Sequence, residues 1–474
     1  MQVSKINLGS LTIAKAKEAL KKKEFSSVEL TKAYLERIEK LEPKLNAFVT
    51  ITHDEALKNA KTADEKIAKG EDLPLLGIPL AIKDNFSTNG IKTTASSKVL
   101  DNYIPPFDAT VITKLKEAGM VLLGKTNMDA FAHGSSTETS DFGPSKNPWN
   151  TAHLPGGSSG GSAVTVAADE ALAAIGSETA GSIRQPANWC GVVGFKPTYG
   201  RVSRYGVVAM GSSLDSPGPI TKTVEDSAII LQVLAGKDPS DATTSPLAVP
   251  DYLKNFKNDI KGLKIGISDD YFEGVDPEVK RQVEDGIKVM EKLGAKIKKI
   301  KLFHPKYAIA VYTILQRAEV SSNLARLDGI RYGNDRSAFG DEAKRRIMLG
   351  TYTLSAGYYD EYFNKALKVR TIIIDDFKKA FADVDVIMGP TSPTTALPIG
   401  ATEGQSMFGE IADMLVEPSS IAGLTGINMP VGFSKAGLPI GMQIFGPHWG
   451  EEIVLRAGYN YEQANPLMDR KPKL

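Results

Sequence analysis

The sequence has little of what a disulfide-stabilised or zinc-binding protein requires. Cys190 is the single cysteine among 474 residues, so no disulfide can form within the chain. The five histidines are scattered and do not show the spacing of zinc ligands. We therefore expect a protein without a metal site that works in a reducing compartment, the cytoplasm.

A strong charge of one sign and long apolar runs are also absent. The 57 Lys and Arg residues almost balance the 56 Asp and Glu residues, so no general field attracts nucleic acid. No segment reaches the roughly 18 apolar residues that a membrane-spanning helix needs. The N-terminal sequence also lacks a basic start followed by an apolar stretch. These absences predict a soluble chain without membrane contact.

Short apolar runs alternate with helical patterns through most of the chain. Residues 10–69 favour helix, and Ser26 and Glu29 have the spacing of a capping box that opens one. Beyond them, LLGIPLAIKDN, ALAAIGSE, VVGFKP and GLKIGISDDY are apolar runs bounded by Gly, Pro or polar residues. This alternation predicts an α/β fold whose strands are buried on both faces.

A polar segment rich in Pro and Ser, residues 235–261, interrupts this pattern. We interpret it as a surface excursion, with a domain boundary as the alternative. Because strand and helix patterns resume after it, we expect residues 1–474 to form one domain. Its parts would be a helical N-terminal segment of about residues 8–70 and a core of about residues 75–225.

Residues 154–186 contain two clusters of Gly and Ser. A flexible linker is one interpretation, but linkers do not carry the apolar ALAAIG between such clusters. A phosphate-binding loop is another, but neither cluster has a GK[ST] ending or GxGxxG spacing. Glycines also allow close backbone approach and N–H groups that converge on an oxyanion, while serine supplies a nucleophile. The two Gly-Ser clusters therefore predict a site for nucleophilic chemistry.

A serine nucleophile needs a base, and no histidine of this chain lies in a motif that would supply one. We expect each of the five to be exposed or to have its hydrogen bonds satisfied. They are His53, His133, His153, His304 and His448. Lys83 is the better candidate, because the apolar run GIPLAIKDN would carry it into the interior, and burial lowers the pKa of a lysine towards neutrality.

Three segments together resemble the amidase signature family: GIPLAIKDN around Lys83, GGSSGGS at 156–162 and SETAGSIRQPA at 177–187. The resemblance implies a large mixed β-sheet covered on both sides by helices. It also implies a relay in which Ser158, behind a cis peptide bond, connects a neutral Lys83 to the nucleophile Ser182. The oxyanion would be bound by the backbone N–H groups of Thr179, Ala180, Gly181 and Ser182, and supporting side chains would be Ser159, Asp84 and Arg184.

Further segments, among them NMDAFAHGSSTETSDFGPSKNPWN and KRRIMLGTYTLSAGYYDEYFNKALKVRT, are similar to the A subunits of tRNA-dependent amidotransferases. This resemblance implies that the chain hydrolyses glutamine. It would pass ammonia to a B subunit, where ATP and Mg²⁺ activate Glu-tRNA(Gln) or Asp-tRNA(Asn). A C subunit would stabilise the complex of the A and B subunits. Misacylated tRNA would contact mainly the B subunit, and this chain would hold no cofactor. Arg346 and Asp413 would bind the α-carboxylate and α-ammonium groups of glutamine, with Tyr312 beside them.

Two positions depart from the pattern of most A subunits, which carry Asp and Gly where this chain has Glu178 and Ala180. Glu178 keeps the charge and has a longer arm towards Arg184. Ala180 adds a methyl group to the oxyanion loop, so we predict a backbone without a positive φ at this residue. Two alternatives stay open: a free-standing amidase of the same family, and a catalytically impaired scaffold subunit.

Overall fold

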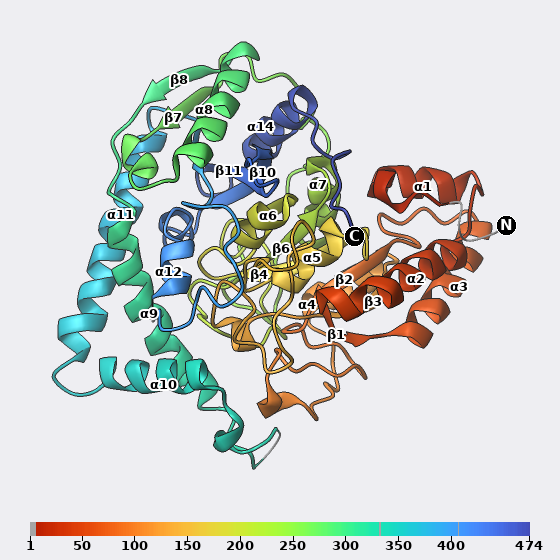
Figure 1. The fold of residues 1–474 in the computed structure, drawn as a ribbon, viewed down its shortest axis with the longest axis horizontal. Coiled ribbons are helices and arrows are strands. Elements are labelled where there is room, and N and C mark those ends of the chain that lie inside the picture. The colour runs from red at the N-terminus through yellow and green to blue at the C-terminus, as the bar shows by residue number, and fades with distance from the viewer. Residues whose placement is uncertain (1–5, 331–332, 406) are drawn as a thin grey trace.

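The computed structural model describes residues 6–330, 333–405 and 407–474. One sheet of eleven strands runs through these residues, in the order β1-β3-β2-β4-β6-β5-β10-β11-β9-β7-β8. Parallel pairs lie towards both ends of the sheet, and antiparallel pairs fill its middle. Helices cover the sheet on both sides (Figure 1). The predicted α/β fold with a large mixed sheet is confirmed.

The strands are short, as expected for buried runs bounded by Gly and Pro. In chain order they are β1 (Phe48–Ile51), β2 (Pro79–Lys83), β3 (Val121–Thr126), β4 (Ala173–Glu178), β5 (Val193–Lys196), β6 (Ser216–Thr221), β7 (Lys264–Ile267), β8 (Lys296–Lys299), β9 (Val386–Pro390), β10 (Thr425–Phe433) and β11 (Pro439–Gly446). Four of them coincide with the four apolar runs quoted above, namely β2, β4, β5 and β7.

The helices form groups at opposite sides of the molecule (Figure 1). The α-helices of the described residues are α1 (Ile13–Lys21), α2 (Ser27–Leu45), α3 (His53–Ala68), α4 (Thr110–Glu117), α5 (Gly160–Ala167), α6 (Arg184–Cys190), α7 (Val224–Leu234), α8 (Pro277–Lys292), α9 (Lys306–Leu324), α10 (Asp341–Thr353), α11 (Lys365–Phe381), α12 (Phe408–Ala412), α13 (Glu417–Ile421) and α14 (Glu451–Ala464). Helices α1 to α3 flank the sheet at its β1 end, and α9 to α11 lie on the other side of the molecule (Figure 1).

The N-terminal segment is less uniformly helical than its pattern predicts. The capping box is confirmed, since Ser26 and Glu29 exchange hydrogen bonds between side chain and backbone at the start of α2. However, Phe48–Ile51 forms an edge strand that pairs antiparallel with β3. The β-branched residues of FVTI suit a strand, and the open sheet edge overrides the helical pattern around them.

The polar segment 235–261 runs over the surface, as predicted, and a few buried residues anchor it to the fold. The carboxylate of Asp238 accepts hydrogen bonds from the hydroxyls of Thr110 and Ser203, and Asp241 pairs with Arg204. Tyr252 is also buried. Polar residues are tolerated here because the fold supplies their hydrogen bonds. Strands β7 and β8, which follow this segment, join the same sheet, and on this basis we propose that the chain is one domain.

The sheet also determines where the Gly-Ser clusters of residues 154–186 lie relative to Lys83. Strands β2 and β4 are parallel neighbours, with Leu80 paired to Ala173 and Ile82 paired to Ile175. Their carboxyl ends therefore lie at one edge of the sheet, where loops of α/β proteins gather functional groups. Lys83 ends β2, and the second Gly-Ser cluster begins where β4 ends.

Candidate active site

Lys83 lies in the interior, as its apolar strand predicts. Its side chain is fully buried, and its ammonium nitrogen donates to the Ser158 hydroxyl at 2.7 Å and to the Ser177 carbonyl at 3.1 Å. Burial lowers the pKa of Lys83 to about 7, although the nearby Asp129, Asp215 and Glu178 carboxylates oppose this shift. A substantial share of Lys83 is therefore uncharged at neutral pH and able to accept a proton.

Ser158 and Ser159 form the turn that leads into α5. The peptide bond between Gly157 and Ser158 is cis, as the resemblance implies. A side chain at Gly157 would bring its Cβ into collision with a carboxylate oxygen of Asp129, so only glycine fits there. Ser159 holds the turn against β4, because its hydroxyl donates to the Ser177 carbonyl at 3.2 Å and its N–H donates to the Ser182 carbonyl at 3.1 Å.

Ser182 follows β4 in a loop whose backbone donors are free. Within the described residues, the N–H groups of Thr179, Ala180, Gly181 and Ser182 have no hydrogen-bond acceptor. Four consecutive unpaired donors in a buried loop are suited to bind an oxyanion. No hydrogen bond joins the hydroxyls of Ser158 and Ser182 in the part of the chain that the structure describes. Catalytic hydrogen bonds often tighten only when substrate binds.

Ala180 adopts the backbone predicted for it, since it is absent from the described non-glycine residues with positive φ. The methyl group is therefore accommodated without backbone strain. Gly181 is constrained for a different reason. A Cβ at this residue would collide with the Asp413 carboxylate, so glycine is needed here for close approach.

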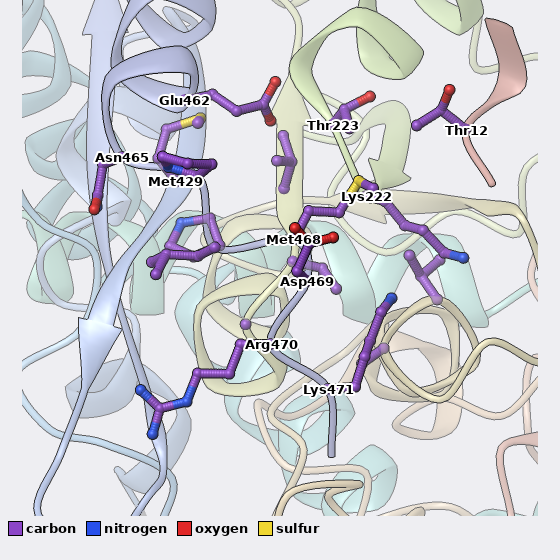
Figure 2. Close-up of a pocket in the computed structure, with 18 of the residues that line it drawn as sticks. Thr12, Lys222, Thr223, Met429, Glu462, Asn465, Met468, Asp469, Arg470 and Lys471 are labelled. Carbon is purple, nitrogen blue, oxygen red and sulfur yellow. The ribbon is translucent and has the colours of Figure 1, made fainter. Parts of the chain in front are cut away.

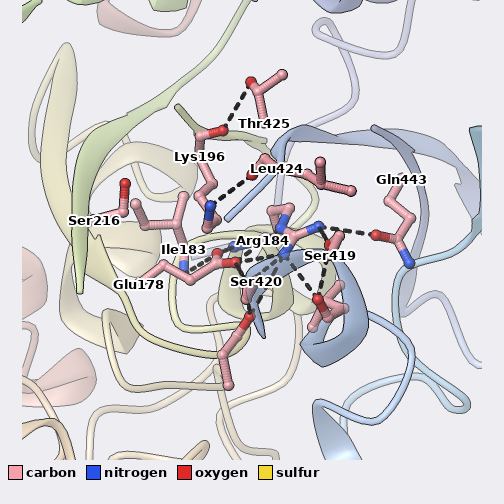
Figure 3. A network of polar contacts seen from close by, with 12 residues as sticks. Glu178, Ile183, Arg184, Lys196, Ser216, Ser419, Ser420, Leu424, Thr425 and Gln443 are labelled. Carbon is pink, nitrogen blue, oxygen red and sulfur yellow. Dashed lines mark hydrogen bonds and ion pairs between the residues drawn. The ribbon is translucent and has the colours of Figure 1, made fainter. Parts of the chain in front are cut away.

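Glu178 and Arg184 form a buried ion pair that supports this loop (Figure 3). Both carboxylate oxygens of Glu178 are used: one accepts from the N–H groups of Ile183 and Arg184, and the other from the Arg184 guanidinium at 2.6 Å. The same guanidinium donates to Ser419, Ser420 and the Gln443 side chain. The longer Glu178 therefore reaches Arg184, and Arg184 connects the Ser182 loop to α13 and β11.

Asp84, the neighbour of Lys83 in sequence, faces a different group. Its carboxylate accepts from the N–H groups of Thr94 and Ser96, and from the Thr94 hydroxyl. It also lies 3.7 Å from the ammonium nitrogen of buried Lys125. Asp84 therefore anchors the loop after β2 and has no direct contact with Lys83 or Ser158 among the described hydrogen bonds.

The three residues expected to bind glutamine lie together although they come from three different segments. Tyr312 on α9 interacts electrostatically with Arg346 on α10 and with Asp413 after α12. All three side chains are buried. Arg346 donates to Glu342 at 2.6 Å but leaves its Nη1 without a partner, and Asp413 accepts from Ser135 at 2.8 Å but leaves its Oδ1 without one. Burial raises the pKa of Asp413 well above its ordinary value.

Several polar residues near this site have no signal in the sequence pattern. Asp215 accepts from the Thr179 hydroxyl at 2.6 Å, and burial raises its pKa to about 6. Asp129 fills the space beside Gly157, and Ser135 holds Asp413. The segments NMDAF and GSSLD, which carry the two acids, are part of the resemblance, but no spacing rule selects the acids within them.

His133 contradicts the expectation that each histidine is exposed or satisfied. Its side chain is fully buried, and neither ring nitrogen has a hydrogen-bond partner among the described residues. Burial lowers the pKa of His133 well below its ordinary value, and Arg346 adds to this effect. The ring is therefore uncharged and lies within the electrostatic reach of the predicted glutamine site.

Cys190 lies outside this site. It is buried, donates to the Pro155 carbonyl, and borders a cavity of about 420 Å³ under the C-terminal segment. Figure 2 shows this cavity between Thr12, the end of α14 and residues 468–471. None of the predicted site residues lines it. Among the described residues there is no cluster of three His, Cys, Asp or Glu side chains able to hold a metal ion, and no helix long and apolar enough to cross a membrane.

The fold and the serine-lysine constellation define a class of enzyme. The family model described as Amidase matches residues 29–455, and the chain belongs to the amidase family. A solved 6-aminohexanoate cyclic dimer hydrolase is similar in structure, with a TM-score of 0.90, 25% identity and coverage of 99% of both chains. The amidase signature fold is therefore confirmed.

Within this family, the chain is similar over nearly its whole length to one kind of subunit. The A subunit of the glutamyl-tRNA(Gln) amidotransferase of Thermoanaerobacter pseudethanolicus is 55% identical over 484 residues, covering 99% of this chain and 99% of that protein. The crystal structure of the corresponding A subunit from Thermotoga maritima has 42% identity and a TM-score of 0.83, covering 97% of this chain and 96% of that one. The chain thus belongs with the A subunits of glutamyl-tRNA(Gln) amidotransferase.

Proposed function

We propose that the chain is the glutaminase subunit of a tRNA-dependent amidotransferase. The observation that supports this most strongly is the 2.7 Å hydrogen bond from Lys83 to Ser158, made by a buried lysine whose pKa is about 7. Such a lysine acts as a base at neutral pH. It lies at the same sheet edge as the Ser182 loop with its free N–H groups.

The proposed reaction uses three side chains in sequence. Lys83 accepts the proton of Ser158, Ser158 accepts the proton of Ser182, and the Ser182 oxygen attacks the carboxamide carbon of glutamine. The N–H groups from Thr179 to Ser182 stabilise the oxyanion that forms. The relay then returns a proton to the nitrogen, ammonia leaves, and water hydrolyses the glutamyl ester on Ser182 by the same steps in reverse.

Arg346 and Asp413 would give this site its preference for an amino acid. The free Nη1 of Arg346 suits the α-carboxylate of glutamine, and the free Oδ1 of Asp413 suits its α-ammonium group. The contact between Asp413 and Gly181 places that acid beside the nucleophile loop. Tyr312 lies within electrostatic reach of both residues.

The ammonia would serve to convert Glu-tRNA(Gln) to Gln-tRNA(Gln), or Asp-tRNA(Asn) to Asn-tRNA(Asn). Partners would be a B subunit, which binds ATP, Mg²⁺ and most of the tRNA, and a C subunit. This chain itself would need no cofactor. Such an enzyme would work in the cytoplasm, where its tRNA substrates are. A free-standing amidase would instead purify alone and accept amides that lack an α-amino acid group.

The test is the substitution Ser182→Ala in the assembled amidotransferase. We expect glutamine-dependent amidation of Glu-tRNA(Gln) to fall by roughly 10⁴-fold or more, because the nucleophile is lost. Amidation with added ammonium chloride should stay near the wild-type rate. Loss of both activities would indicate a structural role for Ser182, and retention of both would rule it out as the nucleophile.

A further inference from the structure

A fourth polar residue, Glu417, lies next to the predicted glutamine site. It is the first residue of α13, and its N–H donates to the Asp413 carbonyl, so one helical turn of backbone separates the two acids. Side chains four residues apart on a helical turn lie on the same side. Helix α13 packs against α9, which carries Tyr312, and α12 lies beside α9 in Figure 1.

Glu417 is buried without any partner for its carboxyl group. Its side chain is fully inaccessible, and neither oxygen accepts a hydrogen bond within the described residues. Its electrostatic neighbours are Asp413, Glu410 and Arg346, which are also the neighbours of Tyr312. Glu417 therefore lies within electrostatic reach of the expected glutamine-binding residues.

The cations in this region are already matched by other acids. Arg346 donates to Glu342 at 2.6 Å, and Arg317 donates to Glu410 at 2.9 Å. Within the described residues, no Lys, Arg or His forms an ion pair with Asp413 or Glu417. Two buried acids without a cation are costly in a protein interior. A cationic group of the substrate would relieve this cost.

The α-ammonium group also has more donors than Asp413 has unoccupied oxygens. An α-ammonium group has three N–H donors, whereas one oxygen of Asp413 is already occupied by Ser135. Both oxygens of Glu417 are free. We propose that Glu417 is a second carboxyl partner of the substrate's α-ammonium group, so that Asp413 and Glu417 together select amides that carry an α-amino group. This inference rests on the proposed glutaminase function.

The test compares glutamine with 4-carbamoylbutanoate, which is glutamine without its α-amino group, as substrates of the assembled amidotransferase. Glu417→Gln should raise the KM for glutamine roughly tenfold, the effect of one charged hydrogen bond, with kcat within about twofold of wild type. It should leave kcat/KM for 4-carbamoylbutanoate unchanged. Glu417→Asp, which keeps the acid on a shorter arm, should raise the KM for glutamine less.

Glu170→Gln is a matched control. Glu170 is likewise fully buried with two unpartnered oxygens, but it lies before β4, at the opposite end of that strand from Thr179. This variant should leave both substrates unaffected. Equal losses with glutamine and 4-carbamoylbutanoate in Glu417→Gln, or an unchanged KM for glutamine, would overturn the inference.

A binding measurement separates this inference from the proposed function. Calorimetric titration of glutamine into Ser182→Ala, and into Ser182→Ala combined with Glu417→Gln, needs no catalysis. We expect the double variant to bind glutamine roughly tenfold more weakly. If the wild-type enzyme binds glutamine but does not hydrolyse it, the proposed function fails and the role of Glu417 stands. Equal binding by the two variants, or no glutamine binding by Ser182→Ala, contradicts the inference.

Discussion

The two halves of the candidate active site differ in how many of their polar groups are already paired. Around Lys83 and Ser159, side chains and backbone are joined by hydrogen bonds of 2.7 to 3.2 Å. Around Arg346, Asp413 and Glu417, polar atoms are buried without partners among the described residues. The difference indicates that the Lys83–Ser158 contact of the proposed relay is preformed by the fold, whereas the proposed site for the amino acid group would be completed by the ligand.

Removing the relay base should have the largest effect. In Lys83→Met, no group remains to accept the proton of Ser158, so we expect kcat for glutamine hydrolysis to fall by about 10³- to 10⁴-fold. The KM for glutamine should change little, because the half of the site around Arg346, Asp413 and Glu417 is intact. Lys83→Arg should be equally inactive, since arginine does not lose its proton. Steady-state kinetics on variants with wild-type melting behaviour would check this, and an active Lys83→Arg would contradict it.

Breaking the ion pair that connects the halves should cost stability as well as activity. In Arg184→Ala, Glu178 is left buried without its cation, so we expect the free energy of unfolding to fall by roughly 3–5 kcal/mol. Urea denaturation would measure the loss. Lys288→Ala, which removes an exposed pair with Asp285, is the control and should change the stability far less, because water screens exposed charges. Similar losses in the two variants would show that the Arg184 network contributes little.

Neutralising the acid beside the nucleophile loop should affect binding more than turnover. In Asp413→Asn, the α-ammonium group loses a charged partner, so we expect the KM for glutamine to rise by roughly 30-fold or more. The value of kcat should stay within a few fold of wild type, because the Lys83–Ser158 contact is untouched. A fall in kcat with unchanged KM would mean that Asp413 supports the relay instead.

Changing the methyl group on the oxyanion loop should have the smallest effect. Ala180 has no positive φ, so Ala180→Gly relieves no strain and only increases the freedom of the unfolded chain. We expect a loss of about 1 kcal/mol or less in the free energy of unfolding, with kcat near wild type. A clear gain in kcat would show that the methyl group obstructs the oxyanion site.

The preformed half was far more predictable from sequence than the unpaired half. The burial of Lys83, the cis bond before Ser158 and the loop of free N–H groups follow from local patterns and from a specific resemblance. Lys83 ends β2 and the loop of N–H groups follows β4, so the apolar patterns of these strands locate both, whereas the cis bond follows from the resemblance alone.

The unpaired half depends on contacts between segments distant in the chain, which no local pattern encodes. Glu417 reaches the site only through the packing of α13 against α9, and Ser135 through a contact with Asp413, 278 residues later. The burial of His133 was missed for the same reason. At this residue the surrounding fold, rather than the local sequence, determines exposure.

The pH dependence of glutamine hydrolysis shows whether a neutral Lys83 is the base of the reaction. The pKa of Lys83 is lowered to about 7, so Lys83 is cationic below this pH and cannot accept a proton, and it becomes neutral above it. We expect kcat/KM for glutamine to rise with pH between about 6 and 8, with a midpoint near 7. A rate that is constant across this range, or that falls as pH rises through 7, would contradict a neutral Lys83 as the base.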